Sequence, residues 1–474
     1  MMTLTETIEV PRAIEECFRY VADFRTTVEW DATAIEAKKT TAGPVGPGTQ
    51  FQLRCKAGPT SIAIAYEITG YTPWQSLELI GSSSWFQVRD LITFDDLGNQ
   101  QTRITYCAEF TYRWGLEPLA KKGEAGLRKM GRASMAGLRR ALIDDNPSPT
   151  PSSQTIKADQ RLPSALACFT RHGYRKGRSR WAPMSTDMSG KRVLITGATS
   201  GLGFAAAQAL LEAQADLTLV IRDPNKVESL SERLFHASGR RPEAIELADL
   251  SLLADVDTLA QRLLQTGAPF DVLINNAGAL FNDFAETSEG IERSTALLLL
   301  SPWRLTEMLH PLLAEHAHPA RVINVVSGGM YTQKLRCEDL MMHPGQYRGA
   351  VAYARAKRAL TVLTEQWAER WAKDRIVVNS MHPGWADTPG VQSSLPLFRR
   401  LTQTVLRTAE EGADTIVWLA RAREADQVSG KLFLDRESRN THLRANTRET
   451  EAERDLLQTW LQNTFARLSL HNDA

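Results

Sequence analysis

A tyrosine and a lysine four residues apart are the side chains of this sequence best suited to acid–base chemistry. Tyr353 and Lys357 fall in a stretch with helical character, so they share one face of the helix. The phenol of a tyrosine has a pKa near 10, roughly three units too high for efficient proton transfer at neutral pH. A neighbouring ammonium group favours the phenolate, so we expect Lys357 to lower the pKa of Tyr353. Such a tyrosine can donate a proton to a carbonyl oxygen or take one from an alcohol.

A serine hydroxyl complements this pair. Ser327 comes directly after the apolar run 322–326, which has the composition of a buried strand. Its hydroxyl could hold and polarise the same substrate oxygen. The candidate catalytic residues are therefore Ser327, Tyr353 and Lys357.

A glycine-rich turn upstream has the features of a phosphate site. The run 192–195 predicts a buried strand, and an Ala-rich helix follows the turn. Glycines let the backbone turn sharply and approach a phosphate, and the open N-terminus of a helix attracts an anion. An ordinary strand-to-helix turn can also hold three glycines, but strand, turn and helix in this order suit a dinucleotide. The candidate residues in this turn are Gly197, Thr199, Ser200, Gly201, Leu202 and Gly203.

Strands and helices alternate from Ser189 to about Arg436, which predicts a parallel, doubly wound α/β sheet. In such a sheet the ligand lies at the carboxyl ends of the strands. Further candidate residues therefore follow the later strands: Asp249, Leu250, Asn275, Ala277, Gly278, Pro383, Gly384 and Thr388. The expected strands are 193–196, 217–221, 244–247, 272–275, 322–326, 377–381 and 431–434.

The first 145 residues have a different pattern, typical of an α+β fold. Residues 4–10 predict a strand, 11–21 a helix, and several runs between 51 and 112 alternate with period two. From Leu116 the apolar residues recur at three and four, which predicts a long amphipathic helix. We expect a curved antiparallel sheet around this helix, enclosing an apolar cavity. Trp30 and Asp31 could line it, although a packing Trp and a turn-forming Asp are favoured, and we interpret this part as a ligand binder.

Residues 146–187 are predicted to link a first domain (1–145) to a second (188–474). Their start is polar and Pro-rich, as in an extended linker. The basic stretch from Arg171 to Arg180 could contact anionic lipid headgroups peripherally or an acidic partner, but a solvated connector is favoured.

Composition narrows the class of protein. The 474 residues carry a formal net charge of +1, which gives no indication of nucleic-acid binding. The five cysteines are odd in number and never paired as CxxC, which favours a reducing compartment and argues against a disulfide framework or a metal site. Without a visible signal peptide or transmembrane run, we expect a cytoplasmic protein that could form homo-oligomers.

The second part resembles the short-chain dehydrogenase/reductase superfamily, a Rossmann fold. The motifs TGxxxGxG (from Thr196), NNAG (from Asn275), Ser327, YxxxK (from Tyr353) and PGxxxT (from Pro383) occur in the expected order. The runs 327–330, 380–391 and 412–415 resemble the type called dehydrogenase/reductase family member twelve. The first part is similar to the polyketide cyclase/START-like (SRPBCC) superfamily, a helix-grip fold, from its element order and the turn 43–49.

These resemblances imply a nicotinamide cofactor and further residue roles. They imply that Lys357 holds the nicotinamide ribose, that Thr388 contacts the carboxamide, that Asn275 lies near the adenine ribose and that Asp249 lies on the adenine. The positive nicotinamide of the oxidised cofactor would also lower the pKa of Tyr353. The resemblance of the first part implies that it binds a hydrophobic ligand. Some members of that superfamily are cyclases or dehydratases.

The end of the strand 217–221 favours NADP(H) over NAD(H). An acidic residue at that tip would accept hydrogen bonds from the ribose of NAD. Here the tip is Ile221, and Arg222 follows with a guanidinium group that matches phosphate oxygens. A solvated loop cation is the alternative interpretation of Arg222.

One position departs from the superfamily. The resemblance places Leu298 where members usually carry an Asn that anchors a relay water. Three hypotheses follow: an NADPH-dependent carbonyl reductase or alcohol dehydrogenase acting on a small apolar substrate, a lipid carrier with a cofactor-sensing dehydrogenase part, and a cyclase or dehydratase centred on the first part. Intact Ser327, Tyr353 and Lys357 favour the first.

Overall fold

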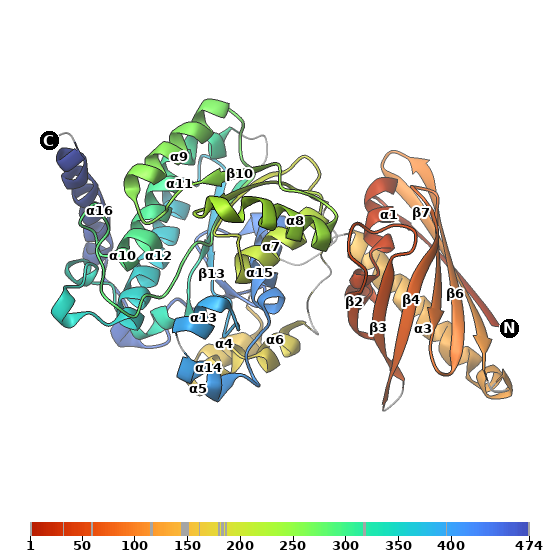
Figure 1. Cartoon of the computed structure of the whole chain (residues 1–474). Coiled ribbons are helices and arrows are strands. Elements are labelled where there is room, and N and C mark those ends of the chain that lie inside the picture. Colours follow the sequence, from red (N-terminus) through yellow and green to blue (C-terminus); the bar gives the residue numbers. More distant parts are fainter. Residues whose placement is uncertain are drawn as a thin grey trace. The chain divides into compact units, whose positions relative to one another are not determined.

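The computed structural model of the chain describes residues 2–31, 33–57, 60–113, 117–143, 151–160, 162–178, 181, 184, 187–315, 319–394 and 396–472. The chain divides into two compact units (Figure 1). Unit 1 consists of residues 1–146, 181–187 and 235–240, and unit 2 of the rest. Gly58 and Pro59, where the sequence predicts a turn between two of the alternating runs, and the Pro-rich start of the predicted linker lie outside the described residues.

Unit 1 is a seven-stranded antiparallel sheet with helices. The strand order is β1-β7-β6-β5-β4-β3-β2. The strands are β1 (Met2–Val10), β2 (Ala34–Lys39), β3 (Gln50–Ala57), β4 (Thr60–Thr72), β5 (Ser76–Ser82), β6 (Phe86–Gly98) and β7 (Gln101–Tyr112). The helices are α1 (Ile14–Ala22), α2 (Thr27–Trp30) and α3 (Glu117–Ile143).

The alternation in the sequence produces this architecture. Alternate residues of each strand face inward, and α3 covers that face with Met135, Leu138 and Leu142 (Figure 1). The predicted curved sheet with one long helix is confirmed. Trp30 is buried in this core, and Asp31 accepts hydrogen bonds from the backbone N–H and the hydroxyl of Thr33, each at 2.8 Å. The interpretation of these two residues as packing and turn-forming groups is confirmed.

Unit 2 is an eight-stranded sheet in the order β10-β9-β8-β11-β12-β13-β14-β15. All neighbours pair in parallel except β14 and β15. The strands are β8 (Arg192–Thr196), β9 (Asp216–Ile221), β10 (Ala244–Leu247), β11 (Val272–Asn275), β12 (Ala320–Val325), β13 (Ile376–Met381), β14 (Leu432–Leu434) and β15 (Glu437–Arg439). All seven predicted strands are present, so the doubly wound sheet is confirmed.

Helices cover both faces of this sheet (Figure 1). In unit 2, α7 (Gly201–Glu212) packs against α15 (Ala409–Arg421), with α8 (Val227–Ser238) beside them. On the opposite face α9 (Leu253–Thr266) packs against α11 (Ser301–Ala314), and α12 (Gly349–Arg370) lies against β13. Unit 2 also contains α10 (Arg293–Thr295), α13 (Pro389–Ser394), α14 (Pro396–Thr402) and α16 (Glu451–Asn472). The central strands are buried on both faces, which explains their continuous apolar runs.

Three short helices occupy much of the predicted linker and belong to unit 2. They are α4 (Ser153–Asp159), α5 (Leu162–Cys168) and α6 (Arg171–Arg178). The buried Arg407 donates from Nε to the carbonyl of Phe169 at 3.1 Å, and Arg171 pairs with Glu411 at 2.9 Å. α6 buries Tyr174 despite its basic composition. This segment is therefore a packed element rather than a solvated connector.

No helix in the described ranges is both long and apolar enough to cross a membrane.

Candidate active site

A cavity of about 630 Å³ lies at the carboxyl ends of the unit 2 strands. It brings together residues from the loops after β8, β9, β10, β11, β12 and β13, as expected for a doubly wound sheet. All three predicted catalytic residues line it. The predicted cofactor residues that also line it are Gly197, Thr199, Ser200, Gly201, Leu202, Gly203, Arg222, Asp249, Leu250, Ala277, Gly278, Pro383, Gly384 and Thr388.

The glycine-rich turn has the geometry of an anion cradle. Gly197 and Gly201 have φ angles of +73° and +58°, in the left-handed region that favours glycine. A Cβ added to Gly203 would lie 2.3 Å from the carbonyl oxygen of Gly197, so only glycine fits there. Ser200 is the N-cap of α7 and makes no capping hydrogen bond with its side chain in the described structure. The first-turn N–H groups of α7 therefore remain available to a phosphate group, and this end of the cavity fits a dinucleotide.

Arg222 and Asp249, which follow β9 and β10, also line the cavity. The Arg222 side chain is 73% exposed, and its Nη1 lies 3.9 Å from Oδ2 of Asp249. Asp249 also accepts hydrogen bonds from the N–H and the hydroxyl of Ser251, at 3.0 and 2.7 Å. Arg222 is thus held only loosely and can turn toward a phosphate, whereas Asp249 has a fixed orientation.

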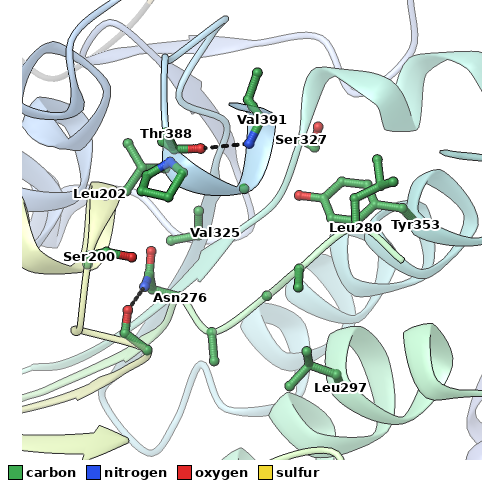
Figure 2. Close-up of a pocket in the computed structure, with 18 of the residues that line it drawn as sticks. Ser200, Leu202, Asn276, Leu280, Leu297, Val325, Ser327, Tyr353, Thr388 and Val391 are labelled. Atoms are coloured by element: carbon green, nitrogen blue, oxygen red, sulfur yellow. Dashed lines mark hydrogen bonds between the residues drawn. The ribbon is translucent and has the colours of Figure 1, made fainter. Parts of the chain in front are cut away.

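Asn275 is the exception among the predicted cofactor residues, because it does not line the cavity. Its side chain, at the end of β11, is buried and donates to Thr306 and to Asn324, each at 2.9 Å. The next residue, Asn276, lines the cavity instead (Figure 2). Its side chain donates to the carbonyl oxygens of Thr196 and Gly197, at 2.9 and 3.0 Å. Successive side chains of a strand point to opposite sides, so only one of the two asparagines can face the ligand. Asn276 braces the glycine-rich turn.

Ser327, Tyr353 and Lys357 lie together on the wall of the cavity formed by β12 and α12. Figure 2 shows the Tyr353 hydroxyl pointing into the cavity on the side where Ser327 lies. Lys357 is buried one helical turn beyond Tyr353 and donates from Nζ to the carbonyl oxygen of Val325 at 2.7 Å. Its Nζ lies 6.0 Å from the centre of the Tyr353 ring. The predicted shared helix face is therefore present.

Burial controls the protonation states of Tyr353 and Lys357. Desolvation raises the pKa of Tyr353, and its hydrogen bond with Ser327 opposes that shift. The sequence predicts that Lys357 lowers the pKa of Tyr353. The protein's own groups instead raise this pKa, because desolvation of the phenol is the largest effect. Desolvation also lowers the pKa of Lys357, to about 7. The phenol is thus protonated at neutral pH and can act as a proton donor.

Leu298 lies beside the cavity wall and is fully buried. It belongs to the π-helical turn η3 (Ala296–Leu300) between α10 and α11. A Cβ added to Gly278 would come within 2.9 Å of its Cδ2, so the leucine fills the space behind the loop after β11. An apolar side chain at this position has no group that could hold a water molecule.

Several apolar side chains also line the cavity, and sequence reasoning did not identify them as site residues. They are Leu280, Phe281, Leu297, Trp385 and Val391. These residues lie in loops and helix ends whose sequence has no periodic signal. The only available indication was sequence proximity: Leu280, Phe281 and Val391 closely follow the NNAG and PGxxxT motifs, and Trp385 lies within PGxxxT. No motif indicated Leu297, which lies in the π-helical turn Ala296–Leu300.

Two family models match the chain. Residues 191–396 match the model described as short chain dehydrogenase, and residues 1–142 match the model described as polyketide cyclase / dehydrase and lipid transport. Dehydrogenase/reductase SDR family member 12 of Bos taurus is 37% identical over 303 residues, covering 63% of this chain and 94% of that protein. Retinol dehydrogenase 14 of Mus musculus is 34% identical over 265 residues, covering 52% of this chain and 78% of that protein.

Solved structures similar to part of this chain include the Pseudomonas aeruginosa RhlG/NADP active-site complex. That structure is 27% identical, with a TM-score of 0.43, and the match covers 52% of this chain and 95% of that one. Another is the angucycline C-6 ketoreductase LanV with bound NADP, 24% identical with a TM-score of 0.43, covering 54% of this chain and 96% of that one.

Proposed function

The chain belongs to the short-chain dehydrogenase/reductase family, and from this premise we propose that unit 2 is an NADPH-dependent reductase of carbonyl groups on small apolar molecules. Family membership makes it an oxidoreductase that acts on alcohol or carbonyl groups with a nicotinamide cofactor. The observation that carries the finer proposal is the convergence of Ser327, Tyr353 and Lys357 with apolar side chains in one cavity.

The residues around the cavity fit a dinucleotide. The turn from Gly197 to Gly203 and the N-terminus of α7 would hold its phosphates, Asp249 and Leu250 would contact the adenine, and Lys357 and Thr388 would hold the nicotinamide end. A nicotinamide bound there supplies a hydride to a carbonyl carbon.

The chain's own residues would manage the proton at the carbonyl oxygen. Ser327 donates a hydrogen bond to that oxygen and fixes its position. Tyr353, whose raised pKa keeps it protonated, transfers its phenolic proton to the same oxygen, and the carbonyl becomes an alcohol. The negative charge of the resulting phenolate favours the protonated form of Lys357, which in turn stabilises the phenolate. The hydrogen bond from Lys357 to the Val325 carbonyl keeps the amine close to Tyr353. The apolar wall of Leu280, Phe281 and Leu297 excludes water from this reaction.

Unit 1 is proposed to bind an apolar ligand of the same pathway. Its support is the match to a family model described as including lipid transport, together with the inward apolar face between the sheet and α3. The proposed location of the chain is the cytoplasm.

Native mass spectrometry of the purified full chain tests this proposal first. We expect an apolar carbonyl or alcohol compound to co-purify, and members of a panel of apolar ketones and aldehydes to be reduced with loss of NADPH absorbance. A panel without turnover, although NADPH binds, would contradict the reductase function and favour a cofactor-sensing carrier.

Replacing Arg222 with alanine tests the choice of cofactor. A charge-assisted contact with the 2′-phosphate contributes about 1.5–3 kcal/mol, or roughly ten- to a hundredfold in affinity. Arg222→Ala should weaken NADPH binding by about that factor and leave NADH binding nearly unchanged, as measured by calorimetric titration. Arg241→Ala removes an exposed arginine that does not line the cavity and should leave both affinities unchanged. Equal losses for both cofactors in Arg222→Ala, or a parent protein that prefers NADH, would overturn the assignment.

Replacing Leu298 with asparagine tests whether the proton path is interrupted. If the leucine only breaks a relay, Leu298→Asn should raise the rate of the chemical step, measured by single-turnover kinetics with NADPH. Leu298→Met keeps the position apolar with a similar volume, so it should leave the rate unchanged. A rate that stays the same or falls in a folded Leu298→Asn protein would mean that another group or open solvent already supplies the proton.

A further inference from the structure

Unit 1 contains a carboxyl group in its core that the reductase chemistry does not use. Asp90 of β6 is 2% exposed and lies in register with Leu79 of β5 and Ala108 of β7. Along β6 it lies on the same face as Val88 and Ile92, which are both buried, so its side chain faces inward. Its Oδ2 has no hydrogen-bond partner in the part of the chain that the structure describes. An unpaired buried carboxyl oxygen costs free energy, and a native protein keeps one only for a reason.

Two tyrosines from neighbouring strands accompany this carboxyl group. Tyr106 of β7 lies diagonally across from Asp90, since its register partner is Ile92. Tyr66 of β4 pairs with Gly81 of β5, which in turn pairs with Val88. Both tyrosines are partly buried and pack against the core of unit 1. Three hydrogen-bonding groups from three strands therefore converge on one inward region of the sheet.

Gly81 is the residue that makes this arrangement possible. A Cβ at position 81 would lie 2.5 Å from Cε1 of Tyr66 and 2.7 Å from Cγ1 of Val88. Any side chain at Gly81 would thus displace the Tyr66 ring, which lies over the glycine toward β6. The missing side chain on β5 lets a residue of β4 reach a residue of β6, two strands away.

Burial also affects the proton on this carboxyl group. Desolvation raises the pKa of Asp90 to about 7; interactions with Tyr106 and Tyr66 oppose that shift, and the charge of Asp31 adds to it. Desolvation likewise raises the pKa values of Tyr66 and Tyr106, so both phenols are neutral. Cys55 of β3 is near enough to Tyr66 to contribute to its raised pKa, and Ser134 of α3 donates to Asp31 at 3.1 Å. Below about pH 7 the group is a neutral acid that can donate a hydrogen bond, as a carboxylic acid in an apolar site can do next to a tyrosine.

We propose that Asp90, Tyr66 and Tyr106 form a second ligand site inside unit 1, which binds an apolar ketone through its carbonyl oxygen. The site rests on the proposed ligand-binding role of unit 1 and adds to it the group that recognises the ligand. A ketone oxygen only accepts hydrogen bonds, and the protonated Asp90 donates one from the oxygen that lacks a partner. A ligand of this class is also the kind of molecule that unit 2 would reduce.

Two probes of matched shape test the site in the full chain without added cofactor. 2-Acetylnaphthalene carries the carbonyl oxygen, and 2-isopropylnaphthalene replaces that oxygen with a methyl group. We expect the ketone to bind about tenfold more tightly at pH 5.5, since one hydrogen bond contributes about 1–1.5 kcal/mol. The preference should disappear by pH 8.5, because ionised Asp90 no longer donates. Isothermal titration calorimetry at both pH values measures it.

Three variants separate recognition from mere packing. Asp90→Asn keeps a donor that does not titrate, so its ketone preference should be the same at both pH values. Asp90→Leu should bind both probes equally at either pH. Asp95→Asn alters an exposed carboxylate of the same strand and should behave as the parent. Should Asp90→Leu fail to fold, the missing pH dependence of Asp90→Asn still decides the question.

The outcomes also separate this site from the proposed role of unit 1. If neither probe binds, unit 1 is not a binder of apolar ligands and the site falls with it. If both probes bind equally to the parent at pH 5.5, the chain binds apolar ligands but Asp90 does not recognise a carbonyl. A ketone preference that persists in Asp90→Leu would locate the recognition elsewhere, including the cavity of unit 2, and would overturn the proposal.

Discussion

Replacing Tyr353 with phenylalanine should lower turnover by about 10²–10⁴-fold, the usual contribution of a positioned proton donor. The ring is kept and only the hydroxyl is removed, so the cavity shape and the bond from Lys357 to Val325 should persist. NADPH binding should therefore remain within about twofold of the parent, because the contacts to the phosphates are unchanged. Steady-state reduction of a panel ketone and calorimetric titration with NADPH measure the two effects.

A second tyrosine provides the control for this substitution. Tyr331 is buried in unit 2, does not line the cavity, and donates to the carbonyl oxygen of Asn440 at 2.9 Å. Tyr331→Phe removes the same hydroxyl and should keep turnover within a few-fold of the parent. Undiminished turnover in Tyr353→Phe would show that Tyr353 is not the proton donor.

Replacing Asp159 with asparagine should lower the free energy of unfolding of unit 2 by about 3–5 kcal/mol. The side chains of Asp159 in α4 and Arg439 in β15 are each 4% exposed. Arg439 donates from Nε to Oδ1 at 3.0 Å, and the N–H of Asn440 donates to Oδ2 at 3.1 Å. The substitution leaves the Arg439 guanidinium buried without its counter-charge, which costs more than the pair itself contributes. Urea unfolding followed by intrinsic fluorescence measures the loss.

An exposed ion pair of unit 2 provides the comparison. Glu232 and Arg241 are 41% and 46% exposed, so Glu232→Gln should cost less than about 1 kcal/mol. A double variant, Asp159→Leu with Arg439→Met, removes both charges and should recover most of the stability. If Asp159→Asn is no less stable than Glu232→Gln, α4 does not contribute to the fold of unit 2 as the structure indicates.

The sequence was sufficient to predict the sheet of unit 2 because its buried parallel strands are continuous apolar runs. It missed β15, whose residues Glu437–Arg439 are polar, and β2, whose residues Ala34–Lys39 lie at a sheet edge and do not alternate clearly. It also missed α4, α5 and α6. Their Pro-rich and basic surroundings resemble a linker, and only tertiary packing of residues such as Phe169 and Tyr174 gives them a buried side.

The candidate site was predictable where a backbone conformation requires a residue type. The glycines of the turn before α7 and the spacing of Tyr353 and Lys357 are constraints of this kind. Asn275 and Asn276 carry the same side chain, and only the strand direction at the end of β11 decides which one faces the cavity. Asp90 could not be recognised because a carboxylate in an alternating strand is normally assigned to the solvent face. The proposed role of Asp90 depends on its proximity to Tyr66 and Tyr106, which are distant from it in sequence.

Transfer of deuterium from NADPH labelled at the nicotinamide C4 position tests the central claim most directly. The full chain is incubated with each C4-labelled epimer of NADPH and with the carbonyl panel, including any compound that co-purifies. The masses of the products are then measured by mass spectrometry. We predict that one epimer delivers a single deuterium to the former carbonyl carbon in the parent protein and about 10²–10⁴-fold more slowly in Tyr353→Phe. NADPH bound at the expected affinity, with no deuterium found in any product from either epimer, would contradict the assignment of unit 2 as a carbonyl reductase.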